Sequence, residues 1–279
     1  MVNKYLYFSR PNELNDPFDC FIPKHYVYNS EQELKNFVET ANNNKNTPKK
    51  ISVEYMKERL ERKEYEKLDY LFTNHLHVLS LSESWNLETM WGRYADNYKG
   101  ICIGYKTLIN DNQNYLEIDS PIANILYSDW LQVINDKQYF LLRKIHYNND
   151  GKHKFNIFNL NIDCIQYNIF HKKEAWADEL EYRVFLHDSE NNLIDDKDGL
   201  FNKISYPDTT LSEILFGYKM PEYEMKIIYD FIINLYKNAS DINFFIVQPD
   251  FEKYELTRYK YIPPKEFYIF NHSEYKENT

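Results

Sequence analysis

Cysteine is scarce in this chain. The 279 residues include three cysteines, Cys20, Cys102 and Cys164, which lie too far apart for zinc-ligand spacing and show no disulfide pairing pattern. An odd number of cysteines without a CxxC motif is typical of a reducing compartment. We therefore expect a cytoplasmic protein.

Long apolar runs and glycine-rich motifs are missing as well. No stretch approaches the roughly 20 apolar residues of a membrane helix, and the first ten residues are too polar and too short for a signal peptide. The chain has only 6 glycines and contains no GxxxxGK[ST], GxGxxG, GxSxG or HExxH motif. We expect no membrane contact, no bound metal and no P-loop nucleotide chemistry.

The chain has fewer basic than acidic residues. The chain carries 43 Asp and Glu against 33 Lys and Arg, a formal net charge of −10 at pH 7. Such a balance argues against a broad nucleic-acid-binding surface. The hydrophobic content of 43% is nevertheless enough to bury a substantial core.

The order of strand-like and helix-like segments predicts an α+β fold. Few strand–helix–strand units follow one another, so we expect a single domain over residues 1–279 with a central, mostly antiparallel or mixed sheet. A charged, helical insertion is expected at about 30–75, starting at a capping box of Ser30 and Glu33. Strands are expected at 4–8, 77–83, 100–105, 122–127, 179–186, 214–217, 242–247 and 254–259, and other helices near 90–94, at 129–146, 156–172 and 222–236.

One window carries the strongest candidate chemistry. Glu179, Glu181 and Arg183 alternate within a segment rich in β-formers, so they are expected to share one face of a strand. Two carboxylates and a guanidinium on one face form either a wall of a polar site or an internal ion-pair network with Lys172 and Lys173. We favour the site.

Two hydroxyl groups are expected on one face of an earlier strand. Ser80 and Ser82 alternate with Leu79 and Leu81. They either belong to a half-buried strand of structural importance only or line the same cleft as the glutamates.

Three blocks of sequence together resemble a known family. The blocks are FSRPNELNDPFD at 8–19, LSLSE at 79–83 followed by MWGRYAD at 90–96 and KGICIGY at 99–105, and Lys172 or Lys173 with Trp176, Glu179, Glu181 and Arg183. Their order resembles the bacterial family catalogued as domain of unknown function 2971, over nearly the whole chain. That family supplies no established activity. Its pattern begins with an extra strand, so we expect either a true start further upstream or a member that has lost part of its site.

A weaker resemblance concerns mechanism. Ser80-Leu81-Ser82 and Glu179-Leu180-Glu181 are similar to the Ser-x-Ser and Glu-x-Glu strands of toxin-type ADP-ribosyltransferases. The resemblance implies NAD as the substrate, with Glu181 stabilising the oxocarbenium-like transition state and Glu179 orienting the acceptor. Ser80 and Ser82 would then hold the cofactor cleft, together with Trp91, Tyr94 and Arg183.

The leading functional hypothesis is therefore an NAD-dependent effector or toxin of bacterial conflict or phage defence. It would act on an unidentified acceptor and be accompanied by an antitoxin or sensor partner. Two alternatives stay open. One is a metal-dependent nuclease that uses Asp16, Asp19, Glu179 and Glu181. The other is a non-catalytic binding module in which Trp91, Trp176 and the tyrosines line a ligand or partner groove.

Overall fold

The structure, a computed structural model, falls into two compact units. It describes residues 4–20, 24–25, 27–43, 50–62, 76–119, 131–151, 155–156, 158, 162–187 and 203–264. Unit 1 comprises residues 1–83 and 107–207, and unit 2 comprises residues 84–106 and 208–279. Each unit is described by itself. The prediction of a single domain stays a prediction.

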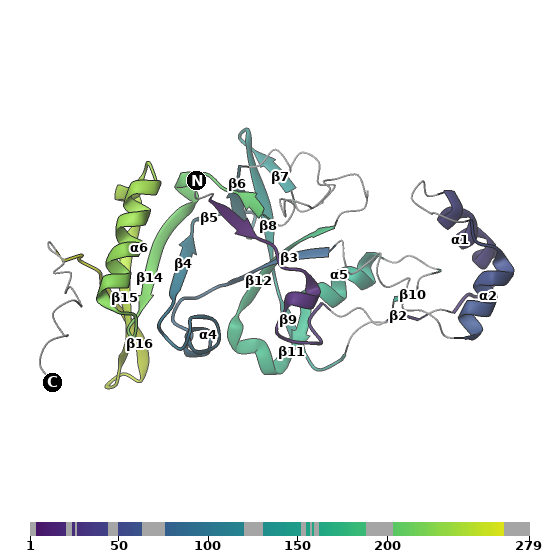
Figure 1. Cartoon of the computed structure of the whole chain (residues 1–279), viewed down its shortest axis with the longest axis horizontal. Coiled ribbons are helices and arrows are strands. Elements are labelled where there is room, and N and C mark those ends of the chain that lie inside the picture. Colours follow the sequence, from purple (N-terminus) through teal and green to yellow (C-terminus); the bar gives the residue numbers. More distant parts are fainter. Residues whose placement is uncertain are drawn as a thin grey trace, which may run out of the picture. The chain divides into compact units, whose positions relative to one another are not determined.

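Unit 1 is built on a six-stranded antiparallel sheet (Figure 1). The strands run in the order β3 (Leu76–Ser82), β12 (Glu181–His187), β8 (Lys137–Lys144), β6 (Gln113–Ile118) and β5 (Thr107–Asn110), and β7 (Leu131–Ile134) also pairs with β8. The sheet contributes Val78, Tyr115, Leu141 and Phe185 to a core that also includes Ile169. This core lies beside the candidate site residues.

Short elements of unit 1 complete the surroundings of the site. Helix α5 (Ile162–Phe170) leads directly into β11 (His171–Lys173), which pairs in parallel with β9 (His146–Asn148). A 3-10 helix, η3 (Glu174–Glu179), then connects β11 to β12. The other short elements are β1 (Tyr5–Tyr7) paired with β13 (Lys203–Ser205), β2 (Lys24–His25) paired with β10 (Phe155–Asn156), and η1 (Pro11–Glu13).

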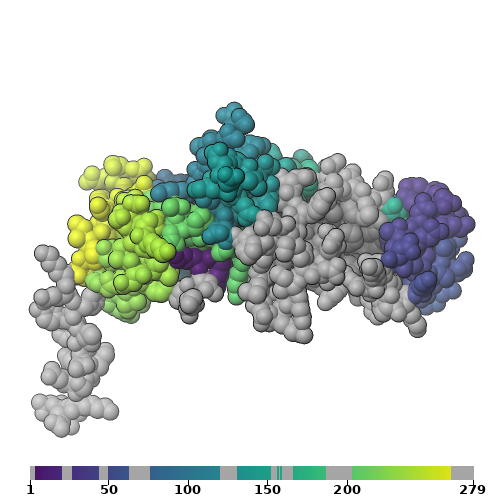
Figure 2. All heavy atoms as spheres, turned by 90° about the horizontal axis from the view of Figure 1, so that it is seen from above, coloured from purple at the N-terminus to yellow at the C-terminus, as the bar shows by residue number. Residues whose placement is uncertain are grey.

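Two charged helices pack on each other in the predicted insertion. Helix α1 (Glu31–Asn43) begins after Ser30, whose hydroxyl accepts the Glu33 N–H at 3.1 Å, and α2 (Val53–Glu61) begins after a similar cap. Their buried contacts are made by Leu34, Val38 and Met56. Figure 2 shows the two helices, in purple and blue, as one block of side chains. Two helices are therefore present, the second ending at Glu61. Residues 63–75 lie outside the described part, and the assignment of 30–75 as an insertion stays a prediction.

Unit 2 is a four-stranded mixed sheet with helices packed against it. The order is β16 (Glu255–Lys260), β15 (Asn243–Asp250), β14 (Leu211–Gly217) and β4 (Ile101–Tyr105), of which β14 and β15 are parallel. Helix α6 (Glu222–Leu235) lies along this sheet in Figure 1. Its Tyr229 ring lies 4.7 Å from that of Phe244, centroid to centroid. The remaining elements are α4 (Glu88–Tyr94), η5 (Asp208–Thr210) and η6 (Ala239–Asp241).

The predicted fold class is confirmed: both units are α+β, with mostly antiparallel sheets. No helix within the described residues is long and apolar enough to cross a membrane. The strand predicted at 122–127 lies outside the described residues.

The helix predicted at 129–146 is wrong. This segment forms the hairpin of β7 and β8, and its turn residues Asn135 and Asp136 have φ values of 50° and 61°. Asn and Asp tolerate this left-handed region, which is the geometry of a two-residue hairpin turn. The run 139–142 is buried at every position, so it lacks the alternation that marks a half-exposed strand.

Two other predicted boundaries need correction. The helix predicted at 156–172 is shorter, because α5 begins at Ile162 and ends at Phe170. The strand predicted from Glu179 begins two residues later, at Glu181. Leu180 between them has φ 46° and ψ 50°, a left-handed conformation that no strand residue can adopt.

Candidate functional site

Five charged side chains form a buried ion cluster in unit 1. Asp19, Lys172, Glu179, Glu181 and Arg183 are each between 1% and 5% exposed. They come from the loop after η1, from β11, from the end of η3 and from β12. Since isolated charges are almost never fully buried, such a group requires internal pairing.

Arg183 is the centre of the buried ion cluster. Its guanidinium donates two hydrogen bonds to Asp19, at 2.7 and 2.6 Å, and two to Glu181, at 2.5 and 3.0 Å. Another donor reaches the Ile169 carbonyl at the end of α5, at 2.8 Å. Burial lowers the pKa of Arg183, but the Cys20 sulfur and the two carboxylates outweigh burial and raise this pKa well above its ordinary value. The group is therefore permanently charged.

Lys172 occupies the other side of the same carboxylates. Its Nζ donates to Glu179 at 2.7 Å and to Glu181 at 3.2 Å, and lies 3.4 Å from Asp19. Burial lowers the pKa of Lys172, but Glu181, Asp19 and Glu179 together raise the pKa above its ordinary value. Its Nζ also lies 4.8 Å from the ring centroid of Trp176. Both glutamates are thus neutralised from within the protein rather than presented to solvent.

The serine strand and the glutamate strand are neighbours. In the antiparallel pairing of β3 with β12, Ser82 lies opposite Glu181 and Ser80 lies opposite Arg183. The Ser82 hydroxyl donates to the Glu179 carbonyl at 2.9 Å, whereas Ser80 is exposed. The structure therefore brings the two predicted motifs into register.

Trp91 and Tyr94, predicted to bind the cofactor, belong to α4 of unit 2. Trp91 is 2% exposed, packs with Leu215 and Val247, and donates its indole N–H to the Trp85 carbonyl at 2.7 Å. These contacts give Trp91 a packing role. Tyr94 is half exposed.

The carboxylates of the nuclease alternative come together only in part. Asp19, Glu179 and Glu181 converge, but Lys172 and Arg183 lie between them. Asp16 accepts the Phe18 N–H at 2.9 Å and so shapes its own loop. Among the described residues, no three His, Cys, Asp or Glu side chains are arranged to hold a metal ion.

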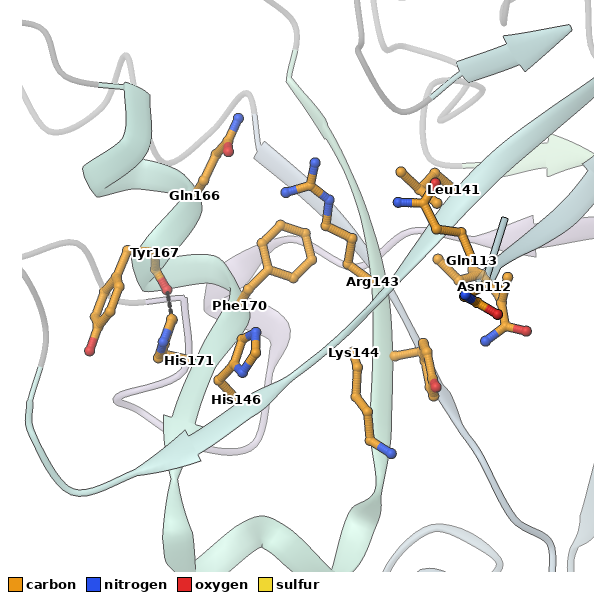
Figure 3. Close-up of a pocket in the computed structure, with 13 residues that line it drawn as sticks. Asn112, Gln113, Leu141, Arg143, Lys144, His146, Gln166, Tyr167, Phe170 and His171 are labelled. Atoms are coloured by element: carbon orange, nitrogen blue, oxygen red, sulfur yellow. Dashed lines mark hydrogen bonds between the residues drawn. The ribbon is translucent and has the colours of Figure 1, made fainter. Parts of the chain in front are cut away.

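A groove of about 480 Å³ opens elsewhere on unit 1, and we call it the basic groove (Figure 3). Four of its residues, Arg143, Lys144, His146 and His171, are basic. The others are Asn112, Gln113, Asn114, Leu141, Leu142, Gln166, Tyr167, Phe170 and Tyr182. The lining contains no aspartate and no glutamate.

Three rings are stacked along one wall of the basic groove. The ring of His171 lies 3.6 Å from that of Tyr167 and 5.2 Å from that of His146, centroid to centroid. His146 and His171 are direct partners in the pairing of β9 with β11. His171 Nδ1 lies 2.7 Å from the Tyr167 carbonyl oxygen. Because a carbonyl can only accept, Nδ1 of His171 carries a proton and donates this hydrogen bond.

Sequence reasoning missed the basic groove. Arg143 and Lys144 fell inside a helix that was predicted wrongly, and the pairing of His146 with His171 joins positions far apart in the chain. The Asn135-Asp136 turn was the one available signal, because it would have placed Arg143 and Lys144 on a strand.

The buried ion cluster and the basic groove share backbone. Lys172 follows His171, and Tyr182 lies between Glu181 and Arg183 in β12. The Ile169 carbonyl bound by Arg183 precedes Phe170 of the groove. The buried ion cluster therefore fixes the position of three groove-lining residues.

Comparison with known proteins gives one match. No curated protein and no solved structure matches the chain, and nothing in the comparisons supports the resemblance to ADP-ribosyltransferases. Residues 90–184 contain the whole lining of the basic groove and four members of the buried ion cluster. This segment matches the model of a family described as "Protein of unknown function (DUF2971)".

Proposed function

We propose that this protein is a binding module for an anionic small molecule, which it holds in the basic groove. One observation carries the proposal: the lining has four basic residues and no carboxylate, in a chain of net charge −10. Acidic residues outnumber basic ones over the whole chain, so their absence from this groove creates a local site for negative charge.

Arg143 and Lys144 suit this role in different ways. Arginine offers a planar set of donors that matches carboxylate or phosphate oxygens. Lys144 donates to Glu83 at 2.6 Å, and this hydrogen bond raises the pKa of the lysine. Both partners of that pair are about half exposed, so the pair is weak and an incoming anion can compete for the lysine.

The buried ion cluster supports binding by positioning the groove. Its residues hold the backbone of β11 and β12 and the end of α5, each of which supplies a groove residue. A site assembled on rigid elements loses less conformational entropy when the ligand binds. This role also accounts for the burial of Glu179 and Glu181 without assigning them chemistry.

Calorimetric titration with sodium pyrophosphate tests the proposal. Native protein is expected to bind pyrophosphate, and Arg143→Ala is expected to weaken binding about tenfold, the loss of one charge-assisted hydrogen-bonding partner. Arg62→Ala is the matched control, because Arg62 is an exposed arginine of unit 1 outside the groove. Equal affinities for the two variants, or no binding to native protein, would exclude the groove as the site.

A second candidate function is ADP-ribosyl transfer from NAD, for an effector or toxin with an unidentified acceptor and an antitoxin or sensor partner. It is supported by the register of β3 and β12, which sets Ser82 opposite Glu181. Glu181 is 4% exposed and held by Lys172 and Arg183, so catalysis requires the buried ion cluster to open.

Incubation with labelled NAD and a cell lysate tests this second candidate. It predicts nicotinamide release by native protein and its loss in Glu181→Gln at a temperature at which the variant is still folded. Glu174→Gln, an exposed neighbour that accepts a hydrogen bond from Asn149, serves as the control. Absence of nicotinamide release and label transfer from folded native protein rejects the candidate.

A further inference from the structure

We infer that the ligand of the basic groove is a nucleoside diphosphate or a closely similar phosphorylated nucleoside. The inference rests on the proposed binding function and adds a class of ligand to it. It depends on features other than charge: an open ring stack, an ordered row of polar groups, and the size of the groove.

The ring stack provides a platform for a base. Tyr167, His171 and His146 follow one another, and His146 is the exposed end of the series. The gap of 5.2 Å between the two histidine rings is too narrow to admit a further ring between them. A planar ligand group therefore extends the stack on the outer side of His146, and stacking on a ring tolerates any base.

The polar groups lie in an order that suits a base followed by phosphates. Figure 3 shows Arg143 and Lys144 between the histidine rings on one side and Asn112 and Gln113 on the other. In Figure 3 the guanidinium of Arg143 and the ammonium of Lys144 point in opposite directions, so phosphates that follow a base on His146 contact one of these two groups rather than both.

The far end of the groove offers amide donors. The side-chain oxygen of Gln113 accepts the Tyr115 hydroxyl at 2.8 Å, and its NH₂ group is a hydrogen-bond donor. Asn112 lies in the turn between β5 and β6 with a φ of 61°, a conformation suited to asparagine. These groups are placed to bind terminal phosphate oxygens.

The groove has the size of a small-molecule site. Its volume of about 480 Å³ falls within the range of roughly 300 to 1,000 Å³ that is usual for such pockets. The net charge of −10 disfavours a long polyanion, whose remaining phosphates would face the acidic remainder of the surface. A mononucleotide therefore suits the site better than a nucleic-acid strand.

Titration of ADP and of sodium pyrophosphate, each against native protein and two His146 variants, tests the inference. The measured quantity is the ratio of the two affinities, because removal of the His146 imidazole affects both ligands. Native protein is expected to bind ADP at least about tenfold more tightly than pyrophosphate, the contribution of one stacked base. The ratio is expected to fall towards one in His146→Ala and to be retained in His146→Phe, which keeps a ring.

The outcomes separate the inference from the proposed function. If pyrophosphate and ADP bind equally well to native protein, the proposed anion-binding function is supported and the nucleotide inference fails. An unchanged ratio in His146→Ala also overturns the inference, because the base then lies elsewhere. If neither compound binds, both the inference and the proposed function fail. Tighter binding of an oligothymidylate than of ADP contradicts the choice of a mononucleotide.

Discussion

Arg183 is the single side chain on which the buried ion cluster most depends. It makes paired hydrogen bonds to Asp19 and Glu181 while 1% exposed, so Arg183→Met leaves the three carboxylates of the cluster with Lys172 as the remaining cation of the cluster. We expect a loss of about 3 to 5 kcal/mol in the free energy of unfolding, measured by urea denaturation. Arg62→Met removes an arginine from an exposed pair with Glu58 and is expected to change stability by less than about 0.5 kcal/mol. Similar losses in both variants would contradict this role.

Cys102 is a second residue with a specific expectation. Burial, together with the nearby carboxylate of Glu213, raises the pKa of its thiol from an ordinary value of 9.0 to about 11. A raised pKa means that little thiolate, the reactive form, exists below about pH 9. Alkylation of Cys102 by iodoacetamide, followed by mass spectrometry, is therefore expected to be slow at pH 8 and to accelerate with a midpoint near pH 11. In urea the midpoint should return to about 9, and a native midpoint near that value would refute the burial argument.

Single residues show how far the sequence could predict the candidate site. The grouping of Glu181 with Arg183 follows from their spacing of two within a strand, which local pattern reveals. Glu179 joins them although it lies in a 3-10 helix, because Lys172 draws its carboxylate inward. Asp19 contacts Arg183 across 164 positions of sequence, and no local pattern encodes such a contact.

At the scale of elements, two glycines of unit 2 differ in the space available for a side chain. A Cβ at Gly217 of β14 would overlap the Tyr98 carbonyl oxygen and lie 2.6 Å from its carbon, both backbone atoms that cannot rotate away. A Cβ at Gly92 of α4 would meet nothing within 4 Å. We expect Gly217→Ala to destabilise the protein by about 1 to 3 kcal/mol. Gly92→Ala, the matched control, should stabilise it by about 0.5 to 1 kcal/mol. Urea denaturation measures the free energy of unfolding of both variants. No change in that free energy for Gly217→Ala would show that the Tyr98 backbone moves to make room for the methyl group.

Elements whose residue pattern indicates their structure could be predicted from the sequence. Elements that depend on pairing with distant residues could not. Helix α6 was predicted at 222–236 and observed at 222–235, because its apolar positions recur with a helical period. The β7–β8 hairpin was missed because four successive buried residues, Tyr139 to Leu142, look the same in a buried strand and a buried helix. Strands as short as β9 and β11 form only by pairing with each other.

At the scale of the whole molecule, the chain crosses between the two units three times. Unit 1 has a core around Val78, Tyr115 and Phe185, and unit 2 has a separate core around Trp91, Leu215 and Val247. Sequence order predicted one domain, and none of the three crossings, near residues 84, 107 and 208, is marked by a linker-like composition. Separate cores nevertheless predict separate stability, since each unit can lose its packing without exposing the core of the other.

Hydrogen exchange in two of the variants tests that expectation. Arg183→Met should lower amide protection in β3, β12 and β8, because the buried ion cluster anchors only strands of unit 1. Gly217→Ala should lower protection in β14 and β15 and leave unit 1 unchanged. Native protein and Gly92→Ala, compared at the same pH and temperature, provide the reference rates. If either variant lowers protection equally in both units, the chain unfolds as one cooperative domain, because separate units would each respond only to the loss of their own contacts.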